Sequence, residues 1–127
     1  MIFWSFLGSF TGIWSIGEIG ARLEIVTTDI LFLVGSFGAS EVLIYGSPLA
    51  EFSQPRNLIF GHLISAFIGV SVYLYLPMGF ALAAAFAVSL SIVAMQLSKT
   101  LHPPGGATAL IAVIGNCLLY TSDAADE

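Results

Sequence analysis

Two short segments place a hydroxyl after two small residues inside otherwise apolar sequence, and they read Gly38-Ala39-Ser40 and Gly106-Ala107-Thr108. Glycine lowers helix stability by up to about 1 kcal/mol relative to alanine, so each segment is a candidate break between half-helices. A half-helix that begins there presents free backbone N–H groups and the positive end of its dipole. Such a terminus can bind an anion without a side-chain cation. Close helix packing through the small residues is the structural alternative.

Four ionisable side chains could act on such an anion. Arg56 has a planar fork of donors that suits an oxyanion held through two oxygens, although it could equally snorkel to lipid headgroups. His62 and His102 titrate near neutral pH, so either could pair with the anion or shuttle a proton. His62 could instead hydrogen-bond a neighbouring helix, and His102 could cap carbonyls in a loop. Glu41 is a candidate proton-coupling carboxyl, or a partner for Arg56 or His62.

The composition indicates that membrane helices position these residues. Hydrophobic residues make up 57% of the 127 residues and charged residues 9%, whereas a soluble domain is typically about 25% charged. A net charge of −5 leaves no basic patch, so nucleic-acid binding is excluded. A bilayer crossing takes about 20 apolar residues. We therefore predict an all-α, polytopic transmembrane bundle with apolar segments at 2–17, 30–46, 57–76, 80–97 and 107–114, the last one truncated.

Enzyme chemistry is not predicted. Glu41, His62 and His102 lack the i, i+4 spacing typical of metal ligands on one helix. No nucleophile elbow, phosphate loop or dinucleotide fingerprint is present in the sequence. We expect no metal and no cofactor.

The two hydroxyl-bearing segments resemble each other. Residues 38–44 and 106–112 share the pattern Gly-Ala-Ser/Thr-x-Val/Leu-Leu/Ile. Three predicted crossings separate them, and an odd number makes the two copies antiparallel in the membrane. Antiparallel copies are typical of an inverted repeat with broken helices. A chance match between common membrane-helix residues is the alternative.

Four motifs in order give the chain a family resemblance. They are Gly35-Ser36-Phe37-Gly38-Ala39-Ser40, Gln54-Pro55-Arg56-Asn57, Gly61-His62-Leu63 and His102-Pro103-Pro104-Gly105-Gly106-Ala107-Thr108-Ala109-Leu110. Together they resemble the HPP family of integral membrane proteins over nearly all of residues 1–116. The resemblance implies a small multi-span bundle, and some members in plastids and cyanobacteria are linked to nitrite transport. Glu41 departs from the pattern, which favours a small or apolar residue there.

We therefore predict a transporter or channel for a small anion, with nitrite as the leading candidate. The binding site is expected between 38–40 and 106–108, with Arg56, His62 and His102 around it. A membrane-embedded scaffold or sensor module without transport activity is the alternative.

The predicted partners are the lipid bilayer and a small anion, and self-association into a homo-oligomer is left open. The expected location is the plasma or inner membrane, or a plastid membrane in a plant. Arg56 and Lys99 on one side outnumber Arg22 on the other. The positive-inside rule therefore places the Met1 side in the cytoplasm.

Residues 117–127 resemble a translated sequencing adapter. We therefore interpret residues 1–116 as an HPP-like transmembrane domain truncated at its C-terminal end. Without the three acids of the tail, the charge becomes 3 − 5 = −2. Cys117 would also be spurious, and a single cysteine excludes an internal disulfide in either case. A genuine acidic tail is the alternative.

The adapter interpretation predicts a divergence in DNA reads. Independent libraries from the same organism should depart from this sequence at the codon for Cys117, because an adapter is joined during library preparation. If independent libraries all encode residues 118–127, the tail is genuine.

Overall fold

The computed structural model describes the backbone of residues 2–22 and 27–123, and side chains within 2–22 and 35–115. The side chains of the suspected adapter segment, 117–127, lie outside the described residues. The described chain forms five α-helices and one 3-10 turn, without strands: α1 (Ile2–Arg22), α2 (Thr27–Gly46), η1 (Glu51–Ser53), α3 (Pro55–Tyr75), α4 (Phe80–Leu97) and α5 (Pro103–Asp123). The prediction of an all-helical bundle is confirmed. By length and composition, α3 and α4 can each cross a membrane.

The first helix is longer than the sequence predicts. The predicted apolar segments end at residue 17 and begin again at residue 30, but α1 continues to Arg22 and α2 begins at Thr27. Glu18 and Arg22 are four residues apart and form an ion pair at 3.0 Å. Such pairs stabilise a helix surface, so the polar residues extend α1 by another turn.

The predicted break in the second segment is wrong. Helix α2 runs without interruption through Gly38 and Ser40. A break would leave backbone N–H and C=O groups without partners at membrane depth, at a cost of several kcal/mol for each group. The helix penalty of one glycine, about 1 kcal/mol at most, is smaller.

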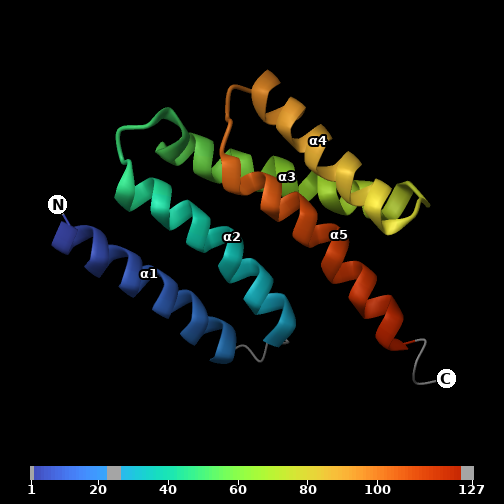
Figure 1. Ribbon diagram of the computed structural model, residues 1–127, viewed down its shortest axis with the longest axis horizontal. Helices are drawn as coiled ribbons and strands as arrows, with labels where there is room; N and C mark the ends of the chain where they lie inside the picture. Colours follow the sequence, from blue (N-terminus) through green and yellow to red (C-terminus); the bar gives the residue numbers. More distant parts are fainter. Residues whose placement is uncertain (1, 23–26, 124–127) are drawn as a thin grey trace.

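The antiparallel arrangement of the two similar segments is confirmed. Figure 1 shows α2 and α5 side by side, with the chain running in opposite directions through them. Helix α5 also contacts α3 and α4, and α1 packs against α2 at the side remote from α4 (Figure 1). Helix α5 therefore lies at the centre of the bundle.

Small residues at every fourth position bring α3, α4 and α5 close together. The buried positions are Gly61, Ser65 and Gly69 on α3, Ala83, Ala87 and Ser91 on α4, and Gly105 and Ala109 on α5. A Cβ at Gly69 would lie 2.6 Å from the Ala109 carbonyl oxygen, and one at Gly105 would lie 2.8 Å from Ser65 Oγ. The backbones of α3 and α5 are therefore in contact, as small-residue motifs allow in membranes.

The connection between α4 and α5 reverses the chain through a helix-capping turn. The Thr100 N–H donates to the Met95 carbonyl at 2.9 Å, and the Lys99 N–H donates to the Gln96 carbonyl at 3.1 Å. Lys99 has a φ of 55°, in the left-handed region that glycine usually occupies in this motif. The turn directs His102 back into the bundle, where it is 0% exposed.

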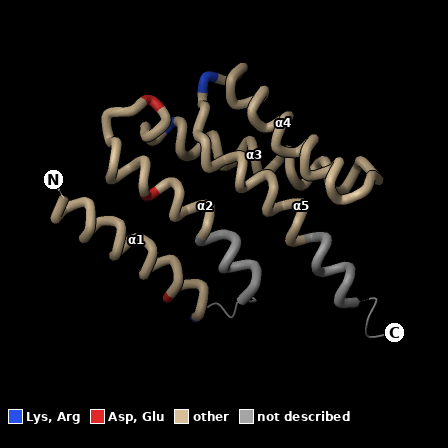
Figure 2. Tube along the Cα trace, viewed as in Figure 1, with Lys and Arg blue, Asp and Glu red and all other residues tan. Residues whose placement is uncertain are grey.

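Charged residues are confined mainly to the helix ends and connections (Figure 2). The Arg56 guanidinium donates to the Ser98 carbonyl at 3.1 Å. Arg56 therefore lies at the same end of the bundle as the connection that carries Lys99. Among the described charged side chains, Glu41 is the exception, because it lies within α2.

The contact between α3 and α5 predicts opposite effects for two glycine substitutions. Gly69→Ala should destabilise the bundle by about 1–3 kcal/mol, because its methyl group meets backbone atoms that must move. Gly35→Ala should leave stability unchanged or raise it, because a Cβ there meets no atom of the described residues within 4 Å and alanine favours the helix. Thermal unfolding in detergent, followed by circular dichroism, measures both. Equal shifts for the two variants would contradict the close approach.

Candidate functional site

The first turns of α3 hold the connection that carries His102. The Asn57 side-chain amide donates to the Leu101 carbonyl at 3.0 Å. Gly61 provides the space for the histidine, because a Cβ at Gly61 would lie 2.6 Å from His102 Cβ. Two of the four sequence motifs, around Asn57 and around Gly61, therefore position the motif that begins at His102.

His102 is oriented by a backbone carbonyl. Its Nδ1 lies 2.7 Å from the carbonyl oxygen of Phe52 in η1. A carbonyl oxygen only accepts, so Nδ1 carries a hydrogen. Burial lowers the pKa of His102, and the hydrogen bond to Phe52 opposes that shift. A lowered pKa favours the neutral ring, whose Nε2 is then an acceptor.

Ser40 connects the two histidines. Its Oγ lies 2.9 Å from Nε2 of His102 and 3.0 Å from Nε2 of His62. On its other side, His62 Nδ1 lies 2.7 Å from Thr108 Oγ1, which in turn lies 2.8 Å from Ser36 Oγ. We call these five side chains, together with the Phe52 carbonyl, the polar network.

One placement of hydrogens satisfies every contact of the polar network when both rings are neutral. Ser40 must donate to Nε2 of His102, because that nitrogen has no hydrogen of its own. Nε2 of His62 must therefore donate to Ser40, and Thr108 donates to the bare Nδ1 of His62. Ser36 then donates to Thr108. The opposite tautomer of His62 would require the single hydrogen of Ser40 to serve two nitrogens.

The network is buried between α2, α3 and the start of α5. Ser36 and Ser40 are each 2% exposed, and the two imidazole centroids are 5.0 Å apart. The Ser40 hydroxyl also lies 3.2 Å from the Ser36 carbonyl oxygen of its own helix. This contact is longer than the contacts with the two histidines, so it competes with them only weakly. Buried polar groups satisfied in this way rigidify the surrounding structure.

A groove between α2 and α3 reaches the polar network. It has a volume of about 400 Å³. It is lined by Phe37, Ser40, Glu41, Ile44, Leu58, Ile59, His62 and Leu63. Its walls are mostly apolar, while Ser40, Glu41 and His62 supply polar groups.

Glu41 lies between this groove and α1. Its carboxyl accepts a hydrogen bond from Ser9, and it packs against Gly12, where a Cβ would collide with it. Its Oε2 is buried and has no hydrogen-bond partner in the part of the chain that the structure describes. The arrangement leaves one carboxyl oxygen available to a proton or a ligand.

The structure brings together some of the predicted site residues and separates others. Ser40, His62, His102 and Thr108 form the network as a group. Arg56 contributes neither to the network nor to the lining of the groove, and its guanidinium contacts the Ser98 carbonyl instead. Four other predicted site residues have no side-chain donor or acceptor and are therefore not part of the network: Gly38, Ala39, Gly106 and Ala107.

The start of α5 offers few backbone donors to the predicted anion. Pro103 and Pro104 occupy its first two positions and have no N–H. The next N–H, that of Gly105, donates to the His102 carbonyl at 2.8 Å. Two prolines and one capped N–H therefore leave few free backbone donors, and an anion would depend on side-chain donors.

Sequence reasoning missed two members of the network. Ser36 lies four residues before Ser40, so the two serines share a face of α2, and this spacing could have identified it. The Phe52 carbonyl could not have been found, because a backbone acceptor leaves no mark in the side-chain pattern.

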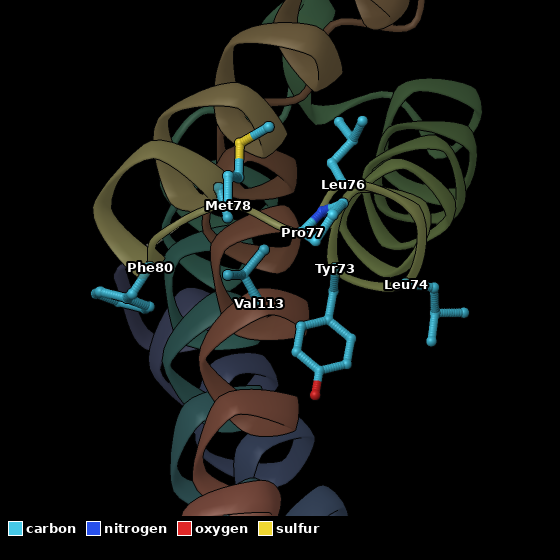
Figure 3. A pocket seen from close by; sticks show the side chains of 8 residues that line it. Tyr73, Leu74, Leu76, Pro77, Met78, Phe80 and Val113 are labelled. Carbon is cyan, nitrogen blue, oxygen red and sulfur yellow. The ribbon is translucent and has the colours of Figure 1, made fainter.

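A second cavity, of about 320 Å³, lies at the turn between α3 and α4 (Figure 3). Its lining consists of Tyr73, Leu74, Leu76, Pro77, Met78, Phe80, Ala83 and Val113. Apart from the phenol of Tyr73, the side chains of this lining are apolar, so the cavity offers no comparable cluster of polar groups.

Comparison with known proteins agrees with the motifs. Residues 1–122 match the family described as HPP, transmembrane region. One similar protein, named a transmembrane protein of Dictyostelium discoideum, is 49% identical over 115 residues, which cover 88% of this chain and 40% of that protein. Another from the same organism is 47% identical over 114 residues, which cover 87% of this chain and 36% of that protein. This chain thus spans less than half the length of either relative. No solved structure matches the chain.

The hydrogen placement predicts different tautomers for the two histidines. His62 should carry its hydrogen on Nε2 and His102 on Nδ1, because Thr108 donates to one ring and the Phe52 carbonyl accepts from the other. Nitrogen NMR of ring-labelled protein in membranes distinguishes the tautomers, and the chain has two histidines to assign. Identical tautomers in both rings would contradict the directed network.

Proposed function

This chain belongs to the HPP transmembrane family, and on that premise we propose that it carries a small anion across a membrane, with nitrite as the leading candidate. Membership and the transmembrane relatives identify an integral membrane protein. The choice of nitrite comes from the family resemblance, in which some members are linked to nitrite transport.

The observation that carries the proposal is the polar network that lies between the helices toward one end of an apolar bundle. Ionisable groups within membrane segments are rare and typically mark substrate or ion pathways. Here two histidines and three hydroxyls from three parts of the chain meet beside a groove.

The network supplies donors of the kind that an oxyanion requires. The Ser40 hydroxyl and the His62 ring both line the groove. An anion that enters the groove can accept the hydrogen of Ser40 in place of Nε2 of His102, and an N–H of a protonated His62 in place of Thr108. Hydrogen bonds to a charged group contribute about 1.5–3 kcal/mol each, so the two groups suffice for a weak transport site without Arg56.

Glu41 sets a condition on transport. An ionised carboxylate in the same groove would repel the anion. The groove therefore favours the anion when Glu41 is neutral, and proton binding at Glu41 would accompany anion entry. This supports the interpretation of Glu41 as a proton-coupling carboxyl.

A scaffold or sensor module is the second candidate function. The network groups are all paired within the chain, and hydroxyls and histidines that bond across helices also stabilise membrane bundles. Under this alternative the network holds α2 against α3 and α5, and no anion crosses.

Nitrite uptake into proteoliposomes tests the proposal. The full-length protein should take up nitrite faster than protein-free liposomes do. His62→Phe should reduce that uptake by roughly tenfold to a hundredfold, because one charge-assisted hydrogen bond of about 1.5–3 kcal/mol is lost.

Ser71→Ala is the matched control, because the Ser71 hydroxyl donates to the Phe67 carbonyl of its own helix, outside the network. It should transport at the wild-type rate. Uptake no faster than in protein-free liposomes, with correctly inserted protein, would favour the scaffold.

A further inference from the structure

We propose that His62, Ser40 and His102 form a proton relay, in which one proton that accompanies the anion is shared between the two rings through the Ser40 hydroxyl. The inference rests on the proposed function and names its coupling ion as the proton. It is carried by the geometry of the polar network, in which one hydroxyl lies within hydrogen-bond distance of both Nε2 atoms.

The hydrogen bonds of the network all point the same way. With both rings neutral, the placement of hydrogens derived above makes the donors run from Ser36 through Thr108, His62, Ser40 and His102 to the Phe52 carbonyl, along the contacts of the polar network. In such a chain each hydroxyl can accept a proton on one side while it releases another on the opposite side. A network assembled for packing alone has no need of this common direction.

The transfer step balances without any other reactant. The Thr108 hydroxyl turns its hydrogen from Nδ1 of His62 toward the Pro104 carbonyl, 3.4 Å away, and a proton then binds Nδ1 and makes the ring an imidazolium. The ring then releases the hydrogen on its Nε2 to Ser40 Oγ, while Ser40 releases its own hydrogen to Nε2 of His102. His62 ends as the neutral Nδ1–H tautomer, Ser40 is again a hydroxyl, and His102 is the imidazolium.

The pair holds one added proton at a time. The ring centroids are 5.0 Å apart, and two positive charges at that separation within an apolar bundle repel strongly. Protonation of one ring therefore opposes protonation of the other, and the two rings titrate as a coupled pair.

Few other charged groups face the relay. Glu41 on α2 shares the groove with His62, and Glu51 in η1 precedes Phe52. Arg56 and Lys99 lie at the end of the bundle near His102, and both are exposed. Helix α4 and the described side chains of α5, over residues 103–115, carry no titratable group. Glu41 is therefore the acid placed to exchange a proton with His62 through the groove.

The experiment follows nitrite and protons in the same vesicles. Proteoliposomes that contain the full-length protein and a trapped pH dye receive an inward nitrite gradient at equal pH on both sides, and protein-free liposomes provide the background. We expect wild-type protein to acidify the interior as nitrite enters. Ser40→Ala should reduce the acidification per nitrite taken up at least tenfold, because alanine cannot pass a hydrogen, whereas a loss of anion binding alone would lower acidification and nitrite uptake together.

Ser91→Ala is the matched control. Ser91 is also a fully buried serine, but its hydroxyl donates to the Val88 carbonyl within its own helix. This variant should acidify the vesicles as the wild type does. Equal acidification by Ser40→Ala and wild type would overturn the relay.

The outcomes separate the relay from the proposed function. Nitrite entry without acidification in the wild type overturns the relay and leaves anion transport standing. If no nitrite moves but a pH gradient collapses through the wild type and not through Ser40→Ala, the relay stands and anion transport fails.

A spectroscopic titration tests the relay even if Ser40→Ala does not fold. In wild-type protein with ring-labelled histidines, the first proton taken up should appear on both rings together, as partial charge on each. A first proton confined to one ring, with the other ring unchanged, would overturn the relay.

Discussion

The contact between the backbones of α3 and α5 is the constraint on which the site depends. It exists because Gly69 and Gly105 have no Cβ at positions where one would collide with the facing helix, and because Gly61 leaves the same space for the connection that leads into α5. Since the helices approach this closely, His62 on α3 lies within 2.7 Å of Thr108 on α5. The same approach places His102 against Gly61 and within reach of Ser40. In a bilayer, where apolar side chains gain little by leaving lipid for each other, contact of this kind provides much of the packing energy.

Much of the bundle could be predicted from the sequence, and the reason is the strength of the membrane constraint. Stretches of apolar residues near the length of a bilayer crossing leave little choice but helices, and the odd number of crossings predicted the antiparallel arrangement of α2 and α5 that is observed. The wrong prediction at Gly38 arose from the assumption that one glycine is enough to break a membrane helix. In the structure its helix penalty is smaller than the cost of unpaired backbone groups at membrane depth.

The residue types of the site were predicted better than its geometry. Ser40 and Thr108 were singled out because each follows a Gly-Ala pair, and His62 and His102 because ionisable groups are rare within membrane segments. Their pairing depends on contacts between helices that are far apart in the chain, and it ends on the carbonyl of Phe52, which no side-chain pattern reveals. Arg56 shows the opposite case, because its donors suit an oxyanion, yet the guanidinium contacts a carbonyl at the end of α4.

The order in which the network residues occur along the chain has a consequence for biogenesis. Ser36 and Ser40 on α2 bond with residues 72 and 62 positions later in the chain. Because chains are made from the N-terminus onward, the hairpin of α1 and α2 is synthesised well before those partners. In the interval the Ser40 hydroxyl has its own helix to bond, through the Ser36 carbonyl at 3.2 Å. Helix α5, which follows α2, α3 and α4 along the chain, is thus the element that completes the polar network.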